Sequence, residues 1–342
     1  MNNDSNMLRE INEIPSAIEK LIEKSEQSII DSANAIRAFA PVLVTTVARG
    51  SSDHAAAYLK YAIELLAKTP VASIGPSISS VYGVELKLCR ALNISISQSG
   101  LSPDIIQMTQ SAKSGGALIV SLTNNINSDM ASASHHVIDI CADEEKSVAA
   151  TKTVVTSIVS GLLLLAHWQQ DHDLIAAIKE IPKKATKAIE CYWSVLSKQL
   201  LEENRLYILG RGPGMAIAHE AALKFKETCQ IHAEAYSSAE VMHGPKSIIG
   251  DNFTVVAFAT EDESENTMIN VLNNLEQQGA NVFATTNKNS NAVRLPFIAG
   301  GHPLINPLLL LVTYYIFIEK LARARGLDPD SPPHLKKVTE TI

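Results

Sequence analysis

Apolar and polar positions in the N-terminal part of the chain follow first the spacing of a helix and then that of a strand. Across residues 14–40 apolar side chains recur every three or four positions, which predicts an amphipathic helix that Pro41 ends. Residues 42–47 form a short run rich in β-branched side chains, which is typical of a buried strand. A tight turn follows at residues 48–52, and an Ala-rich helical stretch continues to Leu66.

The same alternation continues further along the chain. Residues 94–97 predict a strand, residues 98–100 a turn, and the next helix runs to about Ser114 before another strand at residues 117–122. Strands that alternate with helices across short turns indicate a parallel sheet covered by helices on both faces. The sequence therefore predicts an α/β fold.

The second half of the chain repeats the first. Residues 206–212 lead into an Ala-rich helix as residues 44–50 do, and 212 against 50 gives an offset of 162. Residues 279–287 match residues 116–124 at an offset of 163. One such match could arise by chance, but two at nearly one offset predict a duplicated α/β unit. The predicted organisation is an N-terminal helical segment, a first domain, a second domain and a C-terminal tail, at residues 1–40, 41–190, 191–327 and 328–342.

The composition of the chain excludes some classes of function. The 342 residues carry a net charge of −7, from 29 basic and 36 acidic side chains, and no run of Lys or Arg forms a cationic stripe. We therefore expect no nucleic-acid partner. The four cysteines are far apart in the sequence and predict neither a disulfide framework nor a Cys-x-x-Cys site.

Two further features bear on location. The first 30 residues are charged throughout and lack the apolar core of a secretory signal, so we expect a cytoplasmic protein. The most apolar stretch, residues 303–318, is interrupted by polar residues and is too short to cross about 30 Å of hydrocarbon. It predicts a buried helix, and no membrane partner is expected.

Two Ser-rich turns follow predicted strands. Open α/β sheets bind ligands beyond the carboxyl ends of their strands, where helix N-termini present unpaired N–H groups. The polar side chains of these two turns are Ser51, Ser52, Ser97, Gln98, Ser99 and Ser102. Their hydroxyl and amide groups predict a phosphate site that needs no Lys or Arg. The alternative is that these serines only cap helices.

A Lys and a Glu share one face of a predicted helix in the second half. Residues 220–227 should be helical, which places Lys224 and Glu227 three positions apart and side by side. Such a pair in a sugar-sized cleft could transfer a proton next to a carbonyl. The alternative is an exposed ion pair of no catalytic importance.

A histidine stands before a Gly-Pro pair a little further on. His243 precedes Gly244 and Pro245, which predicts a turn rather than the interior of a helix. Binding and catalytic residues often lie on such connections, so His243 is a candidate functional residue.

Six segments together resemble one known family. They look like parts of the isomerase domain of glucosamine-fructose-6-phosphate aminotransferase, in the sugar isomerase (SIS) family, and they lie at residues 7–18, 97–100, 148–152, 222–227, 231–236 and 243–245. The resemblance covers essentially the whole chain. It implies two tandem SIS domains, each with a doubly wound, mainly parallel sheet flanked by helices, and a homodimer with a shared active site.

The resemblance also implies roles for particular residues. The sugar phosphate would be held by Ser52, Ser97, Gln98, Ser99 and Ser102, the last standing where a Thr is usual. Val148 and Thr151 would border the sugar. Glu227 would move the proton between C1 and C2 with Lys224 beside it, and His243 of the partner protomer would open the pyranose ring.

A lysine of the C-terminal tail would face the sugar carbonyl in this family. Counting forward from Leu335 selects Lys337, whereas counting back from Val338 selects Lys336. Our expectation is Lys337, and a solvated basic tail is the alternative.

The aminotransferase carries an N-terminal glutaminase domain, but the resemblance here begins at Met7, so we expect no ammonia from glutamine. The expected reaction is breakdown of glucosamine 6-phosphate to fructose 6-phosphate and ammonia, as in SIS-type glucosamine-6-phosphate deaminases. No metal-ligand spacing is evident, and neither a metal nor a cofactor is expected. Alternatives are a galactosamine-6-phosphate deaminase/isomerase and a fructosamine-6-phosphate deglycase. A non-catalytic sugar-phosphate sensor is a further alternative, although the residues before Pro41 predict one helix and no DNA-binding domain.

Overall fold

The computed structural model describes residues 4–337, so residues 338–342 of the predicted C-terminal tail, with Val338, lie outside the described residues. Contacts divide the chain into two compact units, each built on one sheet. The first, here named the sheet-A unit, comprises residues 13–145, 152–182 and 336–337. The second, the sheet-B unit, comprises residues 4–12, 146–151 and 183–335.

Sheet A is entirely parallel. Its strands are β1 (Leu43–Val47), β2 (Val71–Ser73), β3 (Ala91–Ile96), β4 (Leu118–Thr123) and β5 (His136–Asp139). They lie in the order β2-β1-β3-β4-β5, and Val44 of β1 is paired with Val71 on one side and Leu92 on the other. The strands β3 and β4 are almost wholly buried, which fits their unbroken apolar and β-branched sequence.

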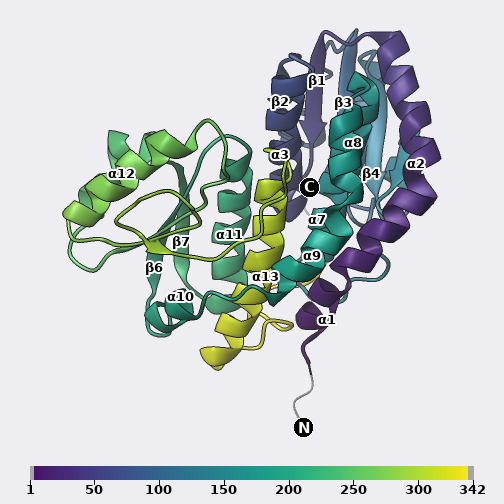
Figure 1. The fold of residues 1–342 in the computed structure, drawn as a ribbon. Coiled ribbons are helices and arrows are strands. Elements are labelled where there is room, and N and C mark those ends of the chain that lie inside the picture. The colour runs from purple at the N-terminus through teal and green to yellow at the C-terminus, as the bar shows by residue number, and fades with distance from the viewer. Residues whose placement is uncertain (1–3, 338–342) are drawn as a thin grey trace. The chain divides into compact units, whose positions relative to one another are not determined.

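Helices cover both faces of sheet A (Figure 1). They are α2 (Ile14–Phe39), α3 (Gly50–Leu66), α4 (Ser77–Ser80), α5 (Pro103–Ser114), α6 (Asp129–Ala133), α7 (Lys152–Gln169) and α8 (His172–Lys179). On one face α7 contacts both α2 and α3, and nearly every residue of α7 is buried. On the other, α5 contacts α4 and α6, and its Ile105 and Met108 pack on Val47 and Ile119 of the sheet.

Sheet B has the same order of strands as sheet A. The strands β6 (Arg205–Gly210), β7 (His232–Ser237), β8 (Thr254–Ala257), β9 (Asn281–Ala284) and β10 (Val293–Arg294) lie in the order β7-β6-β8-β9-β10, all parallel. β6 thus takes the place of β1 and β8 that of β3. The predicted duplication and the predicted α/β class with two parallel sheets are confirmed.

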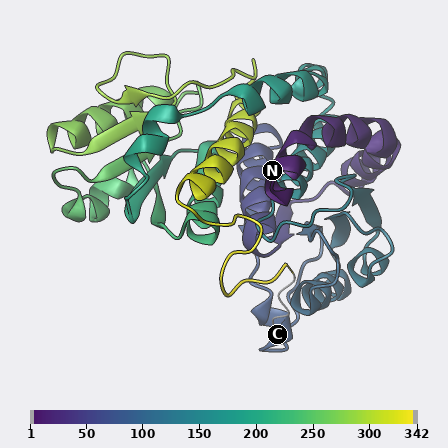
Figure 2. The same cartoon turned by 90° about the horizontal axis from the view of Figure 1, so that it is seen from below.

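The helices of the sheet-B unit enclose an aromatic core. They are α1 (Asn6–Asn12), α9 (Ile181–Glu190), α10 (Ser194–Gln199), α11 (Pro213–Cys229), η1 (Glu240–His243), η2 (Pro245–Ile248), α12 (Glu265–Gln277) and α13 (Asn306–Ala324). α11 packs against α13, the yellow helix of Figure 2. Trp193 contacts Phe317 with ring centroids 5.2 Å apart, and Phe225 contacts Tyr314 at 5.6 Å.

Two predictions concerned helices near the ends of the chain: the one for the C-terminal helix is confirmed, and the one for the N-terminal segment was wrong. Residues 306–324 form the buried helix α13, and none of the helices among residues 4–337 is long and apolar enough to span a membrane. The prediction of a single N-terminal helix was wrong, since α1 precedes α2. Pro15 lies in the first turn of α2, where its ring cannot accommodate a helical carbonyl at Ile11, so α1 cannot continue into α2. The predicted domain boundaries stay a prediction.

Candidate functional site

The carboxyl edge of sheet A changes direction between β1 and β3. The chain leaves β1 toward the edge strand β2, whereas it leaves β3 toward β4 on the opposite side. This is the topological switch point at which open α/β sheets bind ligands. Both predicted Ser-rich turns lie there, because Ser51 and Ser52 are in the first turn of α3 and Ser102 immediately precedes α5.

The turn after β3 is held by its own side chains. The Ser97 hydroxyl accepts a hydrogen bond from the Gly100 N–H, and the Ser99 hydroxyl accepts one from the Leu101 N–H, both at 3.2 Å. Gly100 has φ +64°, and a Cβ there would lie 2.1 Å from the Ser128 Oγ. The backbone can follow this path only with glycine at position 100.

Replacement of Gly100 by Ala should destabilise the protein by about 1–3 kcal/mol, because a left-handed conformation and a collision with Ser128 are combined. Urea denaturation measures this. Gly83→Ala is the matched control, since Gly83 has φ +62° but open space around a Cβ. Equal losses in the two variants would show that the contact with Ser128 has no energetic importance.

Helix capping does not account for the serines next to the helices. Arg49, not a serine, occupies the N-cap position of α3. Ser102 occupies the N-cap position of α5, but its side chain makes no capping hydrogen bond. By contrast, Ser128 does cap α6 by accepting from the Ala131 N–H. This leaves the Ser102 hydroxyl available to a ligand.

The equivalent edge of sheet B has a different chemistry. After β8, Asp262 accepts hydrogen bonds from the Thr260 hydroxyl at 2.8 Å and from the Ser264 hydroxyl at 2.6 Å. Glu265 is buried, accepts from the Thr286 hydroxyl and lies 3.3 Å from the Lys288 ammonium. At this turn both hydroxyls are engaged by Asp262, whereas at the matching edge of sheet A the Ser102 hydroxyl makes no capping hydrogen bond, so sheet A is better suited to an anion.

A charged cluster is buried along α11 in the sheet-B unit. The Lys224 ammonium lies 2.7 Å from Glu227 Oε2 and 3.1 Å from Glu220 Oε1. The side chain of Lys224 is 0% exposed and that of Glu220 1%, whereas Glu227 is 19% exposed. The alternative of an exposed ion pair is therefore wrong. Glu220 was missed by the sequence analysis, although its spacing four residues before Lys224 was a usable signal.

Opposing effects act on Lys224. Burial by itself lowers the pKa of its ammonium, but the carboxylates of Glu220 and Glu227 outweigh burial and raise the pKa above its ordinary value. Lys224 therefore stays charged. The Tyr315 hydroxyl donates to Glu220 Oε1 at 3.0 Å, so the inner carboxylate has two donors and Glu227 is the member closest to solvent. A carboxylate so placed can exchange a proton with a ligand.

His243 ends the short helix η1 and is exposed. Gly244 follows with φ +139°, a conformation that favours glycine, and Pro245 begins η2. The predicted turn at the Gly-Pro pair is thus confirmed, while the role of His243 stays a prediction.

The described part of the C-terminal tail is paired through Lys337. Its ammonium lies 3.0 Å from Glu145 Oε2, whereas Lys336 is exposed. Glu145 is buried and also accepts hydrogen bonds from the Thr153 N–H at 3.1 Å and the Thr153 hydroxyl at 2.7 Å. Glu145 was missed by the sequence analysis, because its burial depends on the start of α7 folding against it.

The segment before α7 contains the two residues expected to border the sugar. Val148 is half-buried and Thr151 is buried. The segment is anchored by Glu10, whose carboxylate accepts from the N–H groups of Lys146 and Ser147. The sheet-A unit thus contains Ser51, Ser52, Ser97, Gln98, Ser99, Ser102 and Lys337, and the sheet-B unit contains Val148, Thr151, Lys224, Glu227 and His243.

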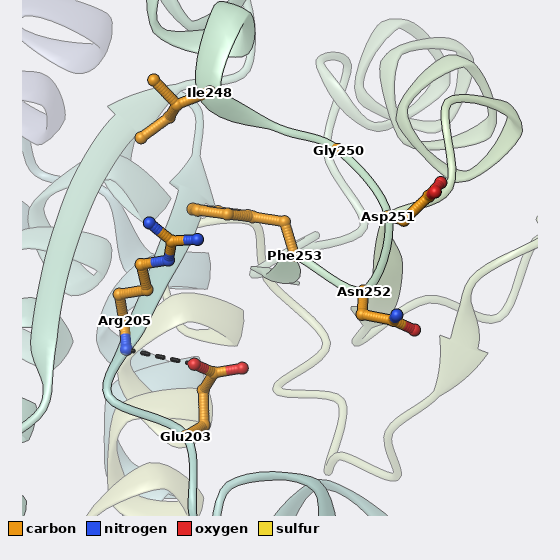
Figure 3. Close-up of a pocket in the computed structure, with 7 residues that line it drawn as sticks. All are labelled: Glu203, Arg205, Ile248, Gly250, Asp251, Asn252 and Phe253. Atoms are coloured by element: carbon orange, nitrogen blue, oxygen red, sulfur yellow. Dashed lines mark hydrogen bonds between the residues drawn. The ribbon is translucent and has the colours of Figure 1, made fainter.

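One pocket of about 260 Å³ lies elsewhere in the sheet-B unit. It is formed at the amino ends of β6 and β8 and contains none of the predicted residues. In Figure 3 the Arg205 guanidinium lies beside the Phe253 ring, 5.7 Å from its centroid, and Glu203 accepts from the Arg205 N–H. Its position at the amino ends of the strands is opposite to that of ligand sites in open α/β sheets.

Comparisons with known proteins agree with this architecture. A model of the SIS domain matches residues 44–167 and 199–298. The chain therefore belongs to the SIS domain family, as its sequence motifs suggested. The glutamine–fructose-6-phosphate aminotransferase (isomerizing) of Sulfolobus acidocaldarius is 32% identical over 340 residues, which cover 97% of this chain and 56% of that protein. The chain thus spans about half the length of this curated relative.

Solved structures show the same fold. A protein of Silicibacter pomeroyi DSS-3, provisionally described as a phosphosugar isomerase, is 48% identical with a TM-score of 0.93, and the match covers 96% of this chain and 100% of that one. The glucosamine-6-phosphate deaminase of Thermotoga maritima is 21% identical with a TM-score of 0.78, over 98% and 100% of the two chains. At that identity the second likeness shows the fold alone.

Proposed function

We propose that the protein is a glucosamine-6-phosphate deaminase, which converts its substrate and water to fructose 6-phosphate and ammonia. The observation that carries the proposal is the buried cluster on α11, in which Lys224 is held between Glu220 and Glu227. An isomerisation next to a carbonyl needs one carboxylate that removes a proton from one carbon and returns it to the neighbouring carbon. Glu227, the least buried member, has this role.

The reaction begins with ring opening, in which His243 moves a proton between the ring oxygen and the C1 hydroxyl. Glu227 then removes the proton from C2 of the open-chain aldehyde and delivers it to C1. A proton also passes from the amino group to the C1 oxygen, so the product is an imine at C2 with a hydroxyl at C1. Water adds to this imine, the C–N bond breaks, and ammonia leaves with fructose 6-phosphate. Lys224 supports the step as the fixed counter-ion of Glu227.

The phosphate end of the substrate is assigned to the switch point of sheet A. The hydroxyls of Ser51, Ser52 and Ser102 and the first N–H groups of α3 and α5 are suited to a phosphate. The serines and Gln98 in the turn after β3 complete the predicted set. At the duplicated position of sheet B the hydroxyls of Thr260 and Ser264 donate to Asp262, which favours the assignment to sheet A.

The C-terminal tail contributes Lys337 in this proposal. Glu145 holds the Lys337 ammonium at 3.0 Å, and an ammonium in that state donates a hydrogen bond to the sugar's carbonyl oxygen. Val148 and Thr151 border the sugar. His243 comes from a second copy of the chain, so the active species is a homodimer, and light scattering that finds an active monomer would contradict this.

Purified protein incubated with glucosamine 6-phosphate should release ammonia and fructose 6-phosphate in equal amounts. Galactosamine 6-phosphate and a fructosamine 6-phosphate are assayed in parallel, because they are the substrates of the two alternative reactions that the sequence leaves open. Release from another substrate only would replace glucosamine 6-phosphate in the proposal. Binding of all three without product would favour a sugar-phosphate sensor.

A further inference from the structure

Arg49 is placed directly at the switch point of sheet A. It follows β1, occupies the N-cap position of α3 and precedes Gly50, which has φ +54°. Ser51 and Ser52 come next in the chain. The turn that carries Ser51 and Ser52 of the proposed phosphate site therefore also carries a guanidinium. The sequence had predicted a phosphate site without a basic residue.

A buried carboxylate on the neighbouring turn fixes this side chain. The Nε of Arg49 donates to Asp104 Oδ2 at 2.8 Å, and Nη2 lies 2.6 Å from the same oxygen. Asp104 is in the first turn of α5, two residues after Ser102, and its side chain is 0% exposed. The ion pair thus ties the turn after β1 to the turn after β3, across the switch point.

The pair uses only one edge of the guanidinium. Within residues 4–337 the Nη1 group of Arg49 has no hydrogen-bond partner, and the side chain is 50% exposed although its partner is fully buried. A guanidinium has five N–H donors in a rigid fork and can bind a second anion while it keeps the first. The charge presented to a ligand here is the cation, because the carboxylate lies behind it.

We propose that Arg49 is a ligand of the substrate's phosphate, held in place by Asp104, and that it makes the site selective for the dianionic form. This inference rests on the proposed function and adds the charge that seryl hydroxyls and helix N–H groups lack. A charge-assisted, planar contact to phosphate oxygens is stronger than a neutral one and depends on phosphate ionisation.

Asp53 is the other acidic group close to Arg49. It lies in the first turn of α3, where burial raises the pKa of its carboxyl and the charges of His54 and Arg49 oppose that rise. Arg49 therefore faces two carboxylates from α3 and α5. Without the charge of Arg49 these two carboxylates should repel a bound dianion. This repulsion adds to the loss of the hydrogen bonds of Arg49.

The test measures binding of inorganic phosphate and of fructose 6-phosphate by calorimetry between pH 5.5 and 8. Wild-type affinity for fructose 6-phosphate should increase as the pH rises through about 6, where a phosphate monoester becomes dianionic. For inorganic phosphate the same increase should come at a higher pH. Arg49→Gln should weaken both ligands about 10- to 100-fold and flatten this pH dependence. Arg49→Lys should recover part of the affinity, because it restores a charge without the fork.

Arg211 offers a matched control. It stands before Gly212 in the duplicated turn of the sheet-B unit, and its Nη1 donates to the Ser237 hydroxyl at 3.0 Å. Arg211→Gln should leave phosphate affinity unchanged. Since Arg49→Gln leaves a buried carboxylate without its cation, Arg49→Gln/Asp104→Asn supplies a second variant with no buried charge, and it should show the same loss of affinity and of pH dependence.

Unchanged phosphate affinity and pH dependence in both Arg49→Gln variants would overturn the inference and reduce the pair to a link between two turns. Arg49-dependent phosphate binding in a protein that releases no ammonia would support the inference and contradict the deaminase proposal. Ammonia release together with phosphate binding that does not depend on Arg49 would support the deaminase proposal and contradict the inference about Arg49.

Discussion

Glu227→Gln should lose turnover of glucosamine 6-phosphate by a factor of about 10²–10⁴ while binding of fructose 6-phosphate remains, since a general base typically contributes that much to a rate. The amide keeps the size of the side chain and can still accept from Lys224, which lies 2.7 Å away in the native protein. It cannot take the C2 proton. Ammonia and fructose 6-phosphate release measure the loss.

Exchange of the substrate's C2 hydrogen in D₂O, followed by NMR, tests the proton transfer separately from the later release of ammonia. Exchange should disappear in Glu227→Gln if this carboxylate moves the proton. Glu190→Gln, an exposed position at the end of α9, is the control for a change of one surface charge. Full turnover or full exchange in Glu227→Gln would show that another group is the base.

Most of the fold could be predicted from local sequence patterns. Helix α2 and strand β1 follow from periodicity and β-branching, and the offset between the Gly50 and Gly212 turns predicted a duplicated α/β unit, which the common strand order of the two sheets confirms. These features depend on residues close together in the chain. The separate helix α1 was missed, because it is only seven residues long and the predicted helical pattern began at Ile14.

The burial of charged side chains could not be predicted from the sequence. Lys224 and Glu227 were visible as neighbours on a helix, but whether such a pair is exposed depends on what covers it, and here Tyr315 comes from 95 positions away from Glu220. The Arg49–Asp104 pair was missed for the same reason, since 55 positions separate its members and only the order of β1 and β3 brings them together. Long-range packing therefore decides which charged residues form the site.

Lys224→Met should destabilise the protein by about 3–5 kcal/mol as well as inactivate it, because Glu220 would remain buried without its cation. Methionine has a comparable length and no charge, so lost packing is a small part of the effect. Chemical denaturation followed by circular dichroism gives the change in the free energy of unfolding.

The double variant Lys224→Met/Glu220→Gln separates an unpaired charge from a poorly packed side chain. The amide of Gln can still accept from the Tyr315 hydroxyl, which donates to Glu220 at 3.0 Å in the native protein, and no buried charge is left. It should recover much of the lost stability but none of the turnover, because Glu227 still lacks its counter-ion. A double variant as unstable as Lys224→Met would show that the side chain of Lys224 stabilises α11 by packing alone, and that the ionic account of this cluster is wrong.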